Sequence, residues 1–312
     1  MPLGTVAAIA QANTENRTTN LNIIAKVYQE YVLHKSTYVY IEQQKLLIAL
    51  VCFECFNEMW KFLILFLFIG QTFTALVPKA VHRHLNDRIV GGQPTNISNF
   101  PWQVSLQRSG THFCGGAVYN EYVIVTAAHC VQGIEISTLK IRAGSTEWYE
   151  GGVLIEADDY KIHENYNAET MINDIAVIHL KSSLTLGTTI KSIPLANKNP
   201  VDGVPAVVSG WGTTFYGSPD LSATLQYVDL YTISHETCAS SAYAYGNDIK
   251  KNMFCAYSPG KDACQGDAGG PLVSEGLLVG IASWGYGCAL PDYPGVYTDI
   301  AELNSWIASS SF

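Results

Sequence analysis

The stretch DACQGDAGGPL, Asp262 to Leu272, sets the main expectation for this chain. Asp262 and Asp267 stand six and one positions before Ala268, and two glycines and a proline follow Ala268. Glycine and proline concentrate where a chain turns, so the stretch predicts a tight loop at the start of a strand. Taken alone, such a loop is usually only a turn, and its meaning depends on what surrounds it.

Composition and charge indicate a folded, acidic domain. The chain has 312 residues, of which 48% are hydrophobic and 14% are charged. This is a globular composition and not a disordered one. Residues 1–88 carry a net charge of +2 and residues 89–312 a net charge of −11. An acidic part without a basic stripe argues against nucleic acid. The charge serves solubility, and it would also favour cationic partners.

The cysteines divide between two parts of the chain. Cys52 and Cys55 form a C-x-x-C pair, which we attribute to chance because no second ligand pair accompanies it. Six more follow residue 89, namely Cys114, Cys130, Cys238, Cys255, Cys264 and Cys288. Six spaced cysteines after an apolar leader predict three disulfides in an oxidising compartment, and their spacing alone leaves fifteen pairings open.

Residues 59–75 have the layout of a secretory signal peptide. A charged start, the apolar run Phe62–Ile69 and a stretch of small residues up to Ala75 follow one another. The signal predicts a secreted, extracellular protein, and the polar residues 76–88 then form a pro-peptide. We interpret residues 1–58 as a non-native or untranslated extension, with translation starting at Met59.

Two alternatives for the N-terminal part stay open. The signal peptide is internal if Met1 is the true start. In that case, Leu46–Phe56 and Phe62–Val77 together could also anchor the chain in a membrane. Three charged residues inside that span make an anchor costly, so we expect no membrane association.

Residues 89–312 fit one all-β domain. Short runs rich in β-branched residues, such as DIAVIHL, AVVSGW and LLVGIASW, alternate with turns, as in a β-barrel or sandwich. The final stretch, Tyr297–Ala308, has apolar residues at Ile300, Leu303 and Ile307, a spacing that predicts one closing helix.

Three separated segments carry the chemistry. TAAHC contains His129, NDIAVIHL contains Asp174, and GDAGGP contains Ala268. In this order, and with RIVGG (88–92), CGGAV (114–118), SGWG (209–212) and SWGYGC (283–288), they resemble the chymotrypsin/trypsin family over residues 88–312. The resemblance implies two six-stranded antiparallel β-barrels with a C-terminal helix, and an active site between the barrels.

The resemblance also implies the roles of the catalytic residues. His129 would be the general base, Asp174 would orient it, and Ala268 stands where the family has its nucleophilic serine. The backbone N–H groups of Gly266 and Ala268 would form the oxyanion hole.

A pocket for a basic side chain follows from the same resemblance. Asp262 would lie at its base, with Ala263, Ser283, Gly285 and Gly295 around it. Ala263 replaces a serine of many trypsins, and a guanidinium can still pair with a carboxylate through two hydrogen bonds. We therefore expect the pocket to prefer Arg over Lys.

Maturation and disulfide pairing are implied as well. Cleavage after Arg88 would free the α-amine of Ile89, which would pair with the buried carboxylate of Asp267. The implied disulfides are Cys114–Cys130, Cys238–Cys255 and Cys264–Cys288. His112 has two interpretations, a hydrogen bond to Asp267 before activation or an ordinary buried histidine.

Ala268 decides between two functions. Alanine has no oxygen, so no acyl-enzyme can form there, which predicts an inactive, protease-shaped binding module. The alternative is an active trypsin-like endopeptidase that cleaves after Arg or Lys, if Ala268 is an engineered change or a sequence error. The chain also resembles mite group 3 trypsin-like allergens and their inactivated paralogues, a resemblance that implies host defence proteins as partners.

The remaining expectations concern ligands and modification. We expect a monomer that binds peptides or proteins through exposed Arg, with no cofactor and no metal. The loop AGSTEWYEGG, which contains Glu147 and Glu150, is too short and poor in carboxylates for calcium. Asn96-Ile97-Ser98 is a glycosylation sequon, and Asn16-Arg17-Thr18 is a second one that matters only if that region is translated.

Overall fold

The computed structural model describes residues 89–311. The extension, the signal peptide, the pro-peptide with Arg88, the Cys52–Cys55 pair and the Asn16 sequon all lie outside these residues. Within residues 89–311, no helix is both long enough and apolar enough to cross a lipid bilayer.

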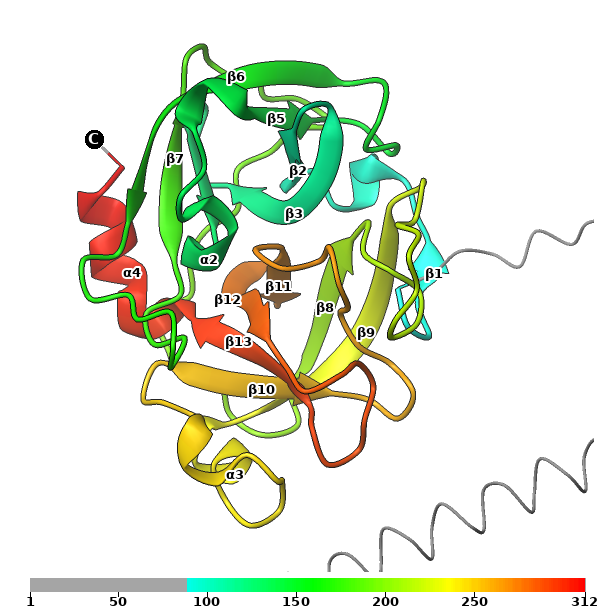
Figure 1. Ribbon diagram of the computed structural model, residues 1–312, viewed down its shortest axis with the longest axis vertical. Helices are drawn as coiled ribbons and strands as arrows, with labels where there is room; N and C mark the ends of the chain where they lie inside the picture. Colours follow the sequence, from blue (N-terminus) through cyan, green and yellow to red (C-terminus); the bar gives the residue numbers. More distant parts are fainter. Residues whose placement is uncertain (1–88, 312) are drawn as a thin grey trace, which may run out of the picture. The chain divides into compact units, whose positions relative to one another are not determined.

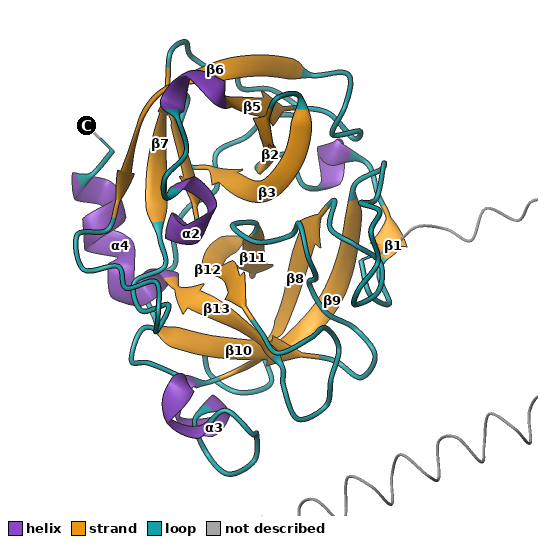
Figure 2. Ribbon diagram, in the orientation of Figure 1, coloured by secondary structure: helices purple, strands orange, loops and turns teal. Residues whose placement is uncertain are grey.

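The first half of the described chain forms a closed antiparallel barrel with the strand order β2-β3-β4-β7-β6-β5 (Figures 1 and 2). Its strands are β2 (Gln103–Arg108), β3 (Thr111–Val118), β4 (Val123–Thr126), β5 (Leu139–Ala143), β6 (Val153–Ile162) and β7 (Ala176–Leu180). In β5, buried Leu139, Ile141 and Ala143 alternate with half-buried residues. This is the period-two pattern of a strand with one face on the core.

The second half forms another antiparallel barrel, in which β8 pairs with both β9 and β11 and so closes the sheet. Its strands are β8 (Pro205–Gly210), β9 (Gln226–Ile233), β10 (Met253–Tyr257), β11 (Pro271–Ser274), β12 (Leu277–Trp284) and β13 (Gly295–Asp299). The short strand β1 (Gln93–Pro94) adds to the outside of β9. The predicted pair of six-stranded barrels is therefore confirmed.

Helices are few among the described residues. They are α2 (Ala128–Val131), α3 (His235–Cys238), α4 (Ile300–Ser309) and the 3₁₀ turns η1 (Ile97–Asn99), η2 (Ile136–Thr138) and η3 (Gly246–Asp248). The predicted closing helix exists, but it begins at Ile300 and not at Tyr297. Tyr297 and Thr298 pair with β10 and β12, and the Asp299 side chain caps the helix by accepting from the N–H of Ala301 at 2.9 Å.

Three disulfides join the described cysteines. They are Cys114–Cys130, Cys238–Cys255 and Cys264–Cys288, the pairs that the family resemblance implies. The first ties α2 to β3, and the third ties the loop before β11 to the loop after β12. Two of the three bonds therefore hold segments that carry predicted site residues.

Candidate functional site

His129 and Asp174 meet although they come from different segments. His129 lies in α2, directly after β4, and Asp174 lies just before β7. One carboxylate oxygen of Asp174 accepts from the backbone N–H of His129 at 2.9 Å, and the other lies 2.8 Å from His129 Nδ1. A carboxylate accepts this hydrogen bond, so Nδ1 carries the proton and Nε2 is left for chemistry.

Asp174 is also held by the second barrel. The Ser283 hydroxyl at the end of β12 donates to Asp174 Oδ2 at 2.6 Å. The Thr298 hydroxyl in β13 donates to the Asp174 carbonyl oxygen at 2.9 Å. Asp174 itself is fully buried. The sequence pattern gave no indication of Thr298, because its contact depends on how the two barrels pack.

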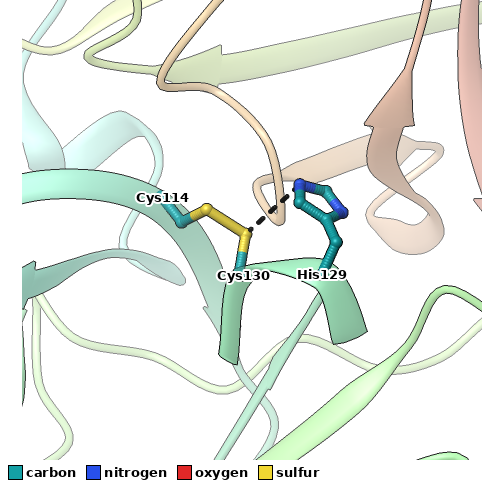
Figure 3. Close-up of side chains that lie close together, drawn as sticks. All are labelled: Cys114, His129 and Cys130. Carbon is teal, nitrogen blue, oxygen red and sulfur yellow. Dashed lines mark hydrogen bonds between the residues drawn. A yellow bond between two sulfur atoms is a disulfide. The ribbon is translucent and has the colours of Figure 1, made fainter. Parts of the chain in front are cut away.

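The disulfide Cys114–Cys130 lies beside the imidazole of His129 (Figure 3). Nε2 of His129 is 3.7 Å from Cys130 Sγ, a weak contact. These three side chains are close enough together to suggest a metal site by proximity alone. A cysteine binds zinc as a thiolate, however, and both sulfurs are used in the S–S bond, which leaves His129 alone. The cluster therefore does not fit a metal while the disulfide is intact.

The loop that contains Ala268 passes against the same sulfur atom. A Cβ added to Gly269 would lie 3.1 Å from Cys130 Sγ. The carbonyl oxygen of Ala268 accepts from the N–H of Gly115 at 2.7 Å, which ties this loop to β3. Cys130 Sγ is thus a neighbour of both His129 and Gly269, and the residue before Gly269, Ala268, has only a methyl group as its side chain.

The backbone N–H groups of Gly266 and Ala268 are free for a ligand. Within residues 89–311, neither group donates to a protein acceptor. Gly266 has a φ of +96°, in the region that only glycine adopts without strain. N–H groups without a protein acceptor are one requirement of an oxyanion hole, so the predicted role of these two groups stays a prediction.

His112 supports this loop from the first barrel. Its Nδ1 lies 2.8 Å from Ser105 Oγ, and its Nε2 lies 2.9 Å from the carbonyl oxygen of Gly266. Burial lowers the pKa of His112 to about 4, against the opposing effect of the Gly266 carbonyl. The interpretation that pairs His112 with Asp267 is not what the structure shows. The ring reaches Gly266 instead, because Asp267 is occupied by backbone donors.

Asp267 is fully buried under the loop. Its carboxylate accepts from the N–H of Gly212 at 2.8 Å and from that of Cys264 at 2.9 Å. Burial raises its pKa to about 7, although both hydrogen bonds lower it. The described residues place no Lys or Arg within ion-pair distance of Asp267. Among residues 89–311, the buried carboxyl group of Asp267 therefore has no Lys or Arg partner.

Ile89 is fully buried in the core of the second barrel, with Val208 and Leu272. The carbonyl oxygen of the next residue, Val90, accepts from the N–H of Asp262 at 3.2 Å. The start of the described chain is thus packed against the loop that holds Asp262 and Asp267.

A cavity of about 230 Å³ lies beside Ala268. Its lining includes all five predicted pocket residues, Asp262, Ala263, Ser283, Gly285 and Gly295. Ser283 directs its hydroxyl to Asp174, so its side-chain oxygen is not free for a ligand in the cavity.

Asp262 gives the cavity a buried carboxyl group with one unpaired oxygen. It is 2% exposed. Its Oδ2 accepts from the N–H of Ala289 at 2.8 Å, while its Oδ1 has no partner. Burial raises its pKa to about 7. A buried carboxylate with an unused oxygen at a cavity wall is stabilised by a ligand that brings a positive charge and N–H donors.

The glycines of the wall leave room for that ligand. A Cβ on Gly295 would lie 2.6 Å from Asp262 Oδ1. A Cβ on Gly285 would meet nothing closer than 3.6 Å, so it would cause no clash. A side chain on Gly295 would therefore block the free carboxylate oxygen.

Two peripheral predictions fall on described residues. Glu147 pairs through its backbone with Thr224, and Ser145 donates to the carbonyl oxygen of Glu150 at 2.5 Å. Among the described residues, neither glutamate belongs to a cluster that could hold a metal. Asn96 is exposed, and its side chain accepts from the N–H of Ser98 at 3.0 Å.

Comparison with known proteins gives one consistent result. A family profile described as Trypsin matches residues 89–307. Trypsin delta of Drosophila melanogaster is 54% identical over 253 residues, which are 81% of this chain and 100% of that protein. Trypsin alpha-4 of Lucilia cuprina is 55% identical over 81% of this chain and 99% of its own length. Trypsin alpha of Drosophila erecta is 57% identical over 75% of this chain and 92% of its own length.

Proposed function

The chain belongs to the trypsin family of serine proteases, and on that premise we propose that it is a secreted binding protein that holds Arg-bearing peptides without hydrolysing them. One observation carries the proposal: residue 268, which lines the same cavity as Asp262, is an alanine, so its side chain is a methyl group without an oxygen.

Hydrolysis in this family begins with a hydroxyl. The serine oxygen attacks the carbonyl carbon of the substrate while the histidine takes the hydroxyl proton, and a covalent acyl-enzyme results. Ala268 supplies neither the oxygen nor the proton, so His129 has nothing to activate. Removing the serine from such a site lowers kcat by roughly a millionfold, or about 8 kcal/mol of transition-state stabilisation.

Binding requires none of the missing chemistry. The guanidinium of an Arg side chain would enter the cavity and pair with Asp262, whose Oδ1 has no other partner. The carbonyl oxygen of the same residue would accept from the N–H groups of Gly266 and Ala268. Arg is favoured over Lys because Ala263 offers no hydroxyl to an ammonium.

Maturation would proceed by cleavage after Arg88. The new α-amine of Ile89 would give Asp267 the cationic partner that it lacks among the described residues. This pairing would stabilise the loop in the shape that presents the two N–H groups. The chain cannot cleave itself without a nucleophile, so a second protease would perform this step.

The alternative function is a trypsin-like endopeptidase that cleaves after Arg or Lys. The fly trypsins among its relatives favour it, as does the otherwise complete site. It requires that Ala268 is an engineered change or a sequence error. Sequencing codon 268 in the source gene separates the two functions, since a serine codon would establish the alternative.

If the codon encodes alanine, the assay is turnover of an Arg-based chromogenic peptide after cleavage at Arg88. We expect no turnover above a mock-processed sample. Turnover within about a hundredfold of a normal trypsin, which is about 2.7 kcal/mol in the barrier, would refute the binding role.

Several further features stay predictions. Secretion with removal of residues 59–75 and translation from Met59 are tested by the intact mass of the secreted chain. A glycan on Asn96 is tested by the mass lost on glycosidase treatment. Three more predictions remain. They are the likeness to mite allergens and their inactivated paralogues, host defence proteins as partners, and a monomeric state.

A further inference from the structure

A groove of about 640 Å³ lies where β1 and η1 meet β9. Six residues line it, namely Pro94, Thr95, Asn96, Asn99, Phe100 and Tyr227. Its volume falls in the range of about 300–1,000 Å³ that is typical of sites for small organic ligands. None of the six residues lines the cavity that contains Asp262, so the groove is a separate candidate site.

Two aromatic rings form an apolar part of the groove. Phe100 is 8% exposed, and Tyr227 is half-buried. The centroids of the two rings lie 5.4 Å apart, and their planes are inclined by 33°. Phe100 also packs with Trp211 and Leu225 in a buried cluster, which holds its ring in place. Such side chains offer a flat apolar surface to a ligand that has an apolar face of its own.

Polar side chains lie in the same groove. Asn99 Nδ2 donates to Thr95 Oγ1 at 3.2 Å. Within residues 89–311, the Asn99 amide oxygen and the Thr95 hydroxyl proton have no protein partner, so both can serve a ligand. A pyranose ring has C–H groups on its faces and hydroxyl groups around its edge. The combination of aromatic rings with an amide and a hydroxyl therefore matches a sugar.

One of the lining residues is the acceptor of the predicted glycan. Asn96 is exposed, and its Oδ1 accepts from the N–H of Ser98 at 3.0 Å. Among the described residues, Asn96 Nδ2 donates to no protein acceptor, so this nitrogen is available for modification. N-glycosylation joins Nδ2 to C1 of an N-acetylglucosamine, while the oligosaccharide leaves a lipid diphosphate and the amide loses one proton. The sugar that is bonded directly to Asn96 therefore starts at the groove.

We propose that the groove binds the first N-acetylglucosamine of a glycan on Asn96, with one face of the sugar ring against Tyr227. The covalent bond keeps the sugar at the groove, so contacts too weak to capture a free sugar are sufficient. Because Asn96 precedes η1 and Tyr227 lies in β9, the bound sugar connects two segments that are far apart in the sequence. The inference rests on the secretion that the proposed function includes and on the predicted glycosylation, and it is independent of residue 268.

The test uses the full chain as secreted by eukaryotic cells, with its glycan trimmed by an endoglycosidase to a single isotope-labelled N-acetylglucosamine. Proton NMR compares the sugar signals of the folded and the denatured protein. An aromatic ring shifts the resonances of protons that lie over its face upfield. We expect upfield shifts of the sugar C–H protons in the folded protein, and nuclear Overhauser contacts between these protons and the ring of Tyr227.

The matched variants are Tyr227→Leu and Tyr231→Leu, which both change a tyrosine of β9. Leucine keeps an apolar side chain and removes the ring. Tyr231 is 54% exposed and does not line the groove, so the upfield shifts should persist in Tyr231→Leu and become smaller in Tyr227→Leu. If Tyr227→Leu is not secreted, the Overhauser contacts in the parent protein decide.

A second measurement detects the connection between the two segments. The N–H of Thr95 donates to the carbonyl oxygen of Leu225 at 2.9 Å. We expect the sugar to slow the exchange of this N–H with solvent at least about threefold relative to Ser98→Ala, which lacks the sequon and keeps Asn96. In the Tyr227→Leu background, the same comparison should give a smaller difference.

Sugar signals at the positions of the denatured glycoprotein would overturn the inference, and so would a secreted chain without a glycan on Asn96. Equal exchange of the Thr95 N–H with and without the sugar would also count against it. Each sample is titrated in parallel with an agmatine peptide, which ends in a guanidinium and lacks a carboxyl group. Failure of this peptide to bind would refute the proposed Arg-binding function and leave the inference about the groove standing.

Discussion

Ala268 shows how much of an active site depends on a single atom. The hydrogen bonds of Asp174 to His129 and Ser283 involve no atom of residue 268, and neither does the support of Gly266 by His112. An alanine at position 268 is therefore compatible with these hydrogen bonds, and its side chain supplies no hydroxyl oxygen. This separation makes position 268 the most informative one to change.

Restoring the serine should restore hydrolysis. In Ala268→Ser, cleaved after Arg88, we expect kcat on an Arg-based chromogenic peptide to rise by roughly a millionfold. The reason is that His129 and Asp174 already form their hydrogen bonds, and that the N–H groups of Gly266 and Ala268 have no protein acceptor within residues 89–311. As control, adding Asp174→Asn should lower kcat again by about 10⁴-fold. A serine variant that stays inactive while its cavity still binds agmatine would show that the site geometry is not competent.

Gly295 keeps the carboxylate of Asp262 accessible. We expect Gly295→Ala to weaken the binding of an agmatine peptide at least about tenfold, because its methyl group would crowd Asp262 Oδ1. Calorimetry measures the change. Gly187→Ala is the matched control, since a Cβ there has nothing within 4 Å. Equal affinities for both variants and the parent would mean that the ligand does not reach Asp262.

At the scale of the loop between β10 and β11, burial of two carboxyl groups has a cost that depends on pH. The pKa of Asp267 rises from 3.8 to about 7, so the folded state keeps a proton that the unfolded state releases. Its contribution to stability is complete below about pH 4 and is lost as the pH rises to about 7. The raised pKa of Asp262 likewise makes the fold less stable as the pH rises, and the lowered pKa of His112 has the opposite effect on stability.

The free energy of unfolding of the uncleaved chain should therefore be compared with that of Asp267→Asn at pH 4 and pH 7 by denaturant titration. We expect the stability of Asp267→Asn relative to the parent to rise by about 3 kcal/mol from pH 4 to pH 7, because the parent's Asp267 ionises over this range and Asn does not. Cleavage at Arg88 should shrink the gain, since the α-amine would then stabilise the ionised Asp267. A constant difference across this range would contradict the raised pKa.

The packing of the C-terminal helix α4 should contribute to the free energy of unfolding. Ile307 is fully buried against the first-barrel core, so Ile307→Ala should lower the free energy of unfolding by about 2–5 kcal/mol. Ser305 is exposed on the same helix, and Ser305→Ala should change it by less than about 0.5 kcal/mol. Similar unfolding midpoints for the two variants would show that α4 contributes little to stability.

The elements could be predicted to different degrees. Strands such as β7, β8 and β12 follow from short apolar runs between turns, and α4 follows from its spacing of apolar residues. The helix start was misplaced because Tyr297 continues β13, whose pairing with β10 is set by residues far away in the chain. The loop residues of the site were predictable only by family resemblance, since their roles arise when two barrels meet. Thr298 and the contact of His112 with Gly266 have no local signal.

At the scale of the whole molecule, the net charge of −11 on residues 89–312 should affect the association rate of charged ligands. We expect the association rate of a peptide with several cationic residues to fall severalfold between about 0.01 M and about 0.15 M salt, as the screening length shrinks from about 30 Å to about 8 Å. Stopped-flow fluorescence measures this. A peptide with the same single Arg flanked by glycine should show a smaller change, and equal salt dependence would contradict long-range attraction.

The hydroxyls of Ser283 and Thr298 reach Asp174 across the junction between the barrels. Asp174 therefore connects the two barrels through hydrogen bonds, whether or not a reaction takes place at the site. A substitution of Asp174 would remove the carboxylate that accepts from Ser283, while the hydrogen bond from Thr298 to the backbone carbonyl oxygen would remain. The presence of His129 and Asp174 is thus consistent with a role in joining the two barrels, and only residue 268 indicates whether the site can hydrolyse a peptide.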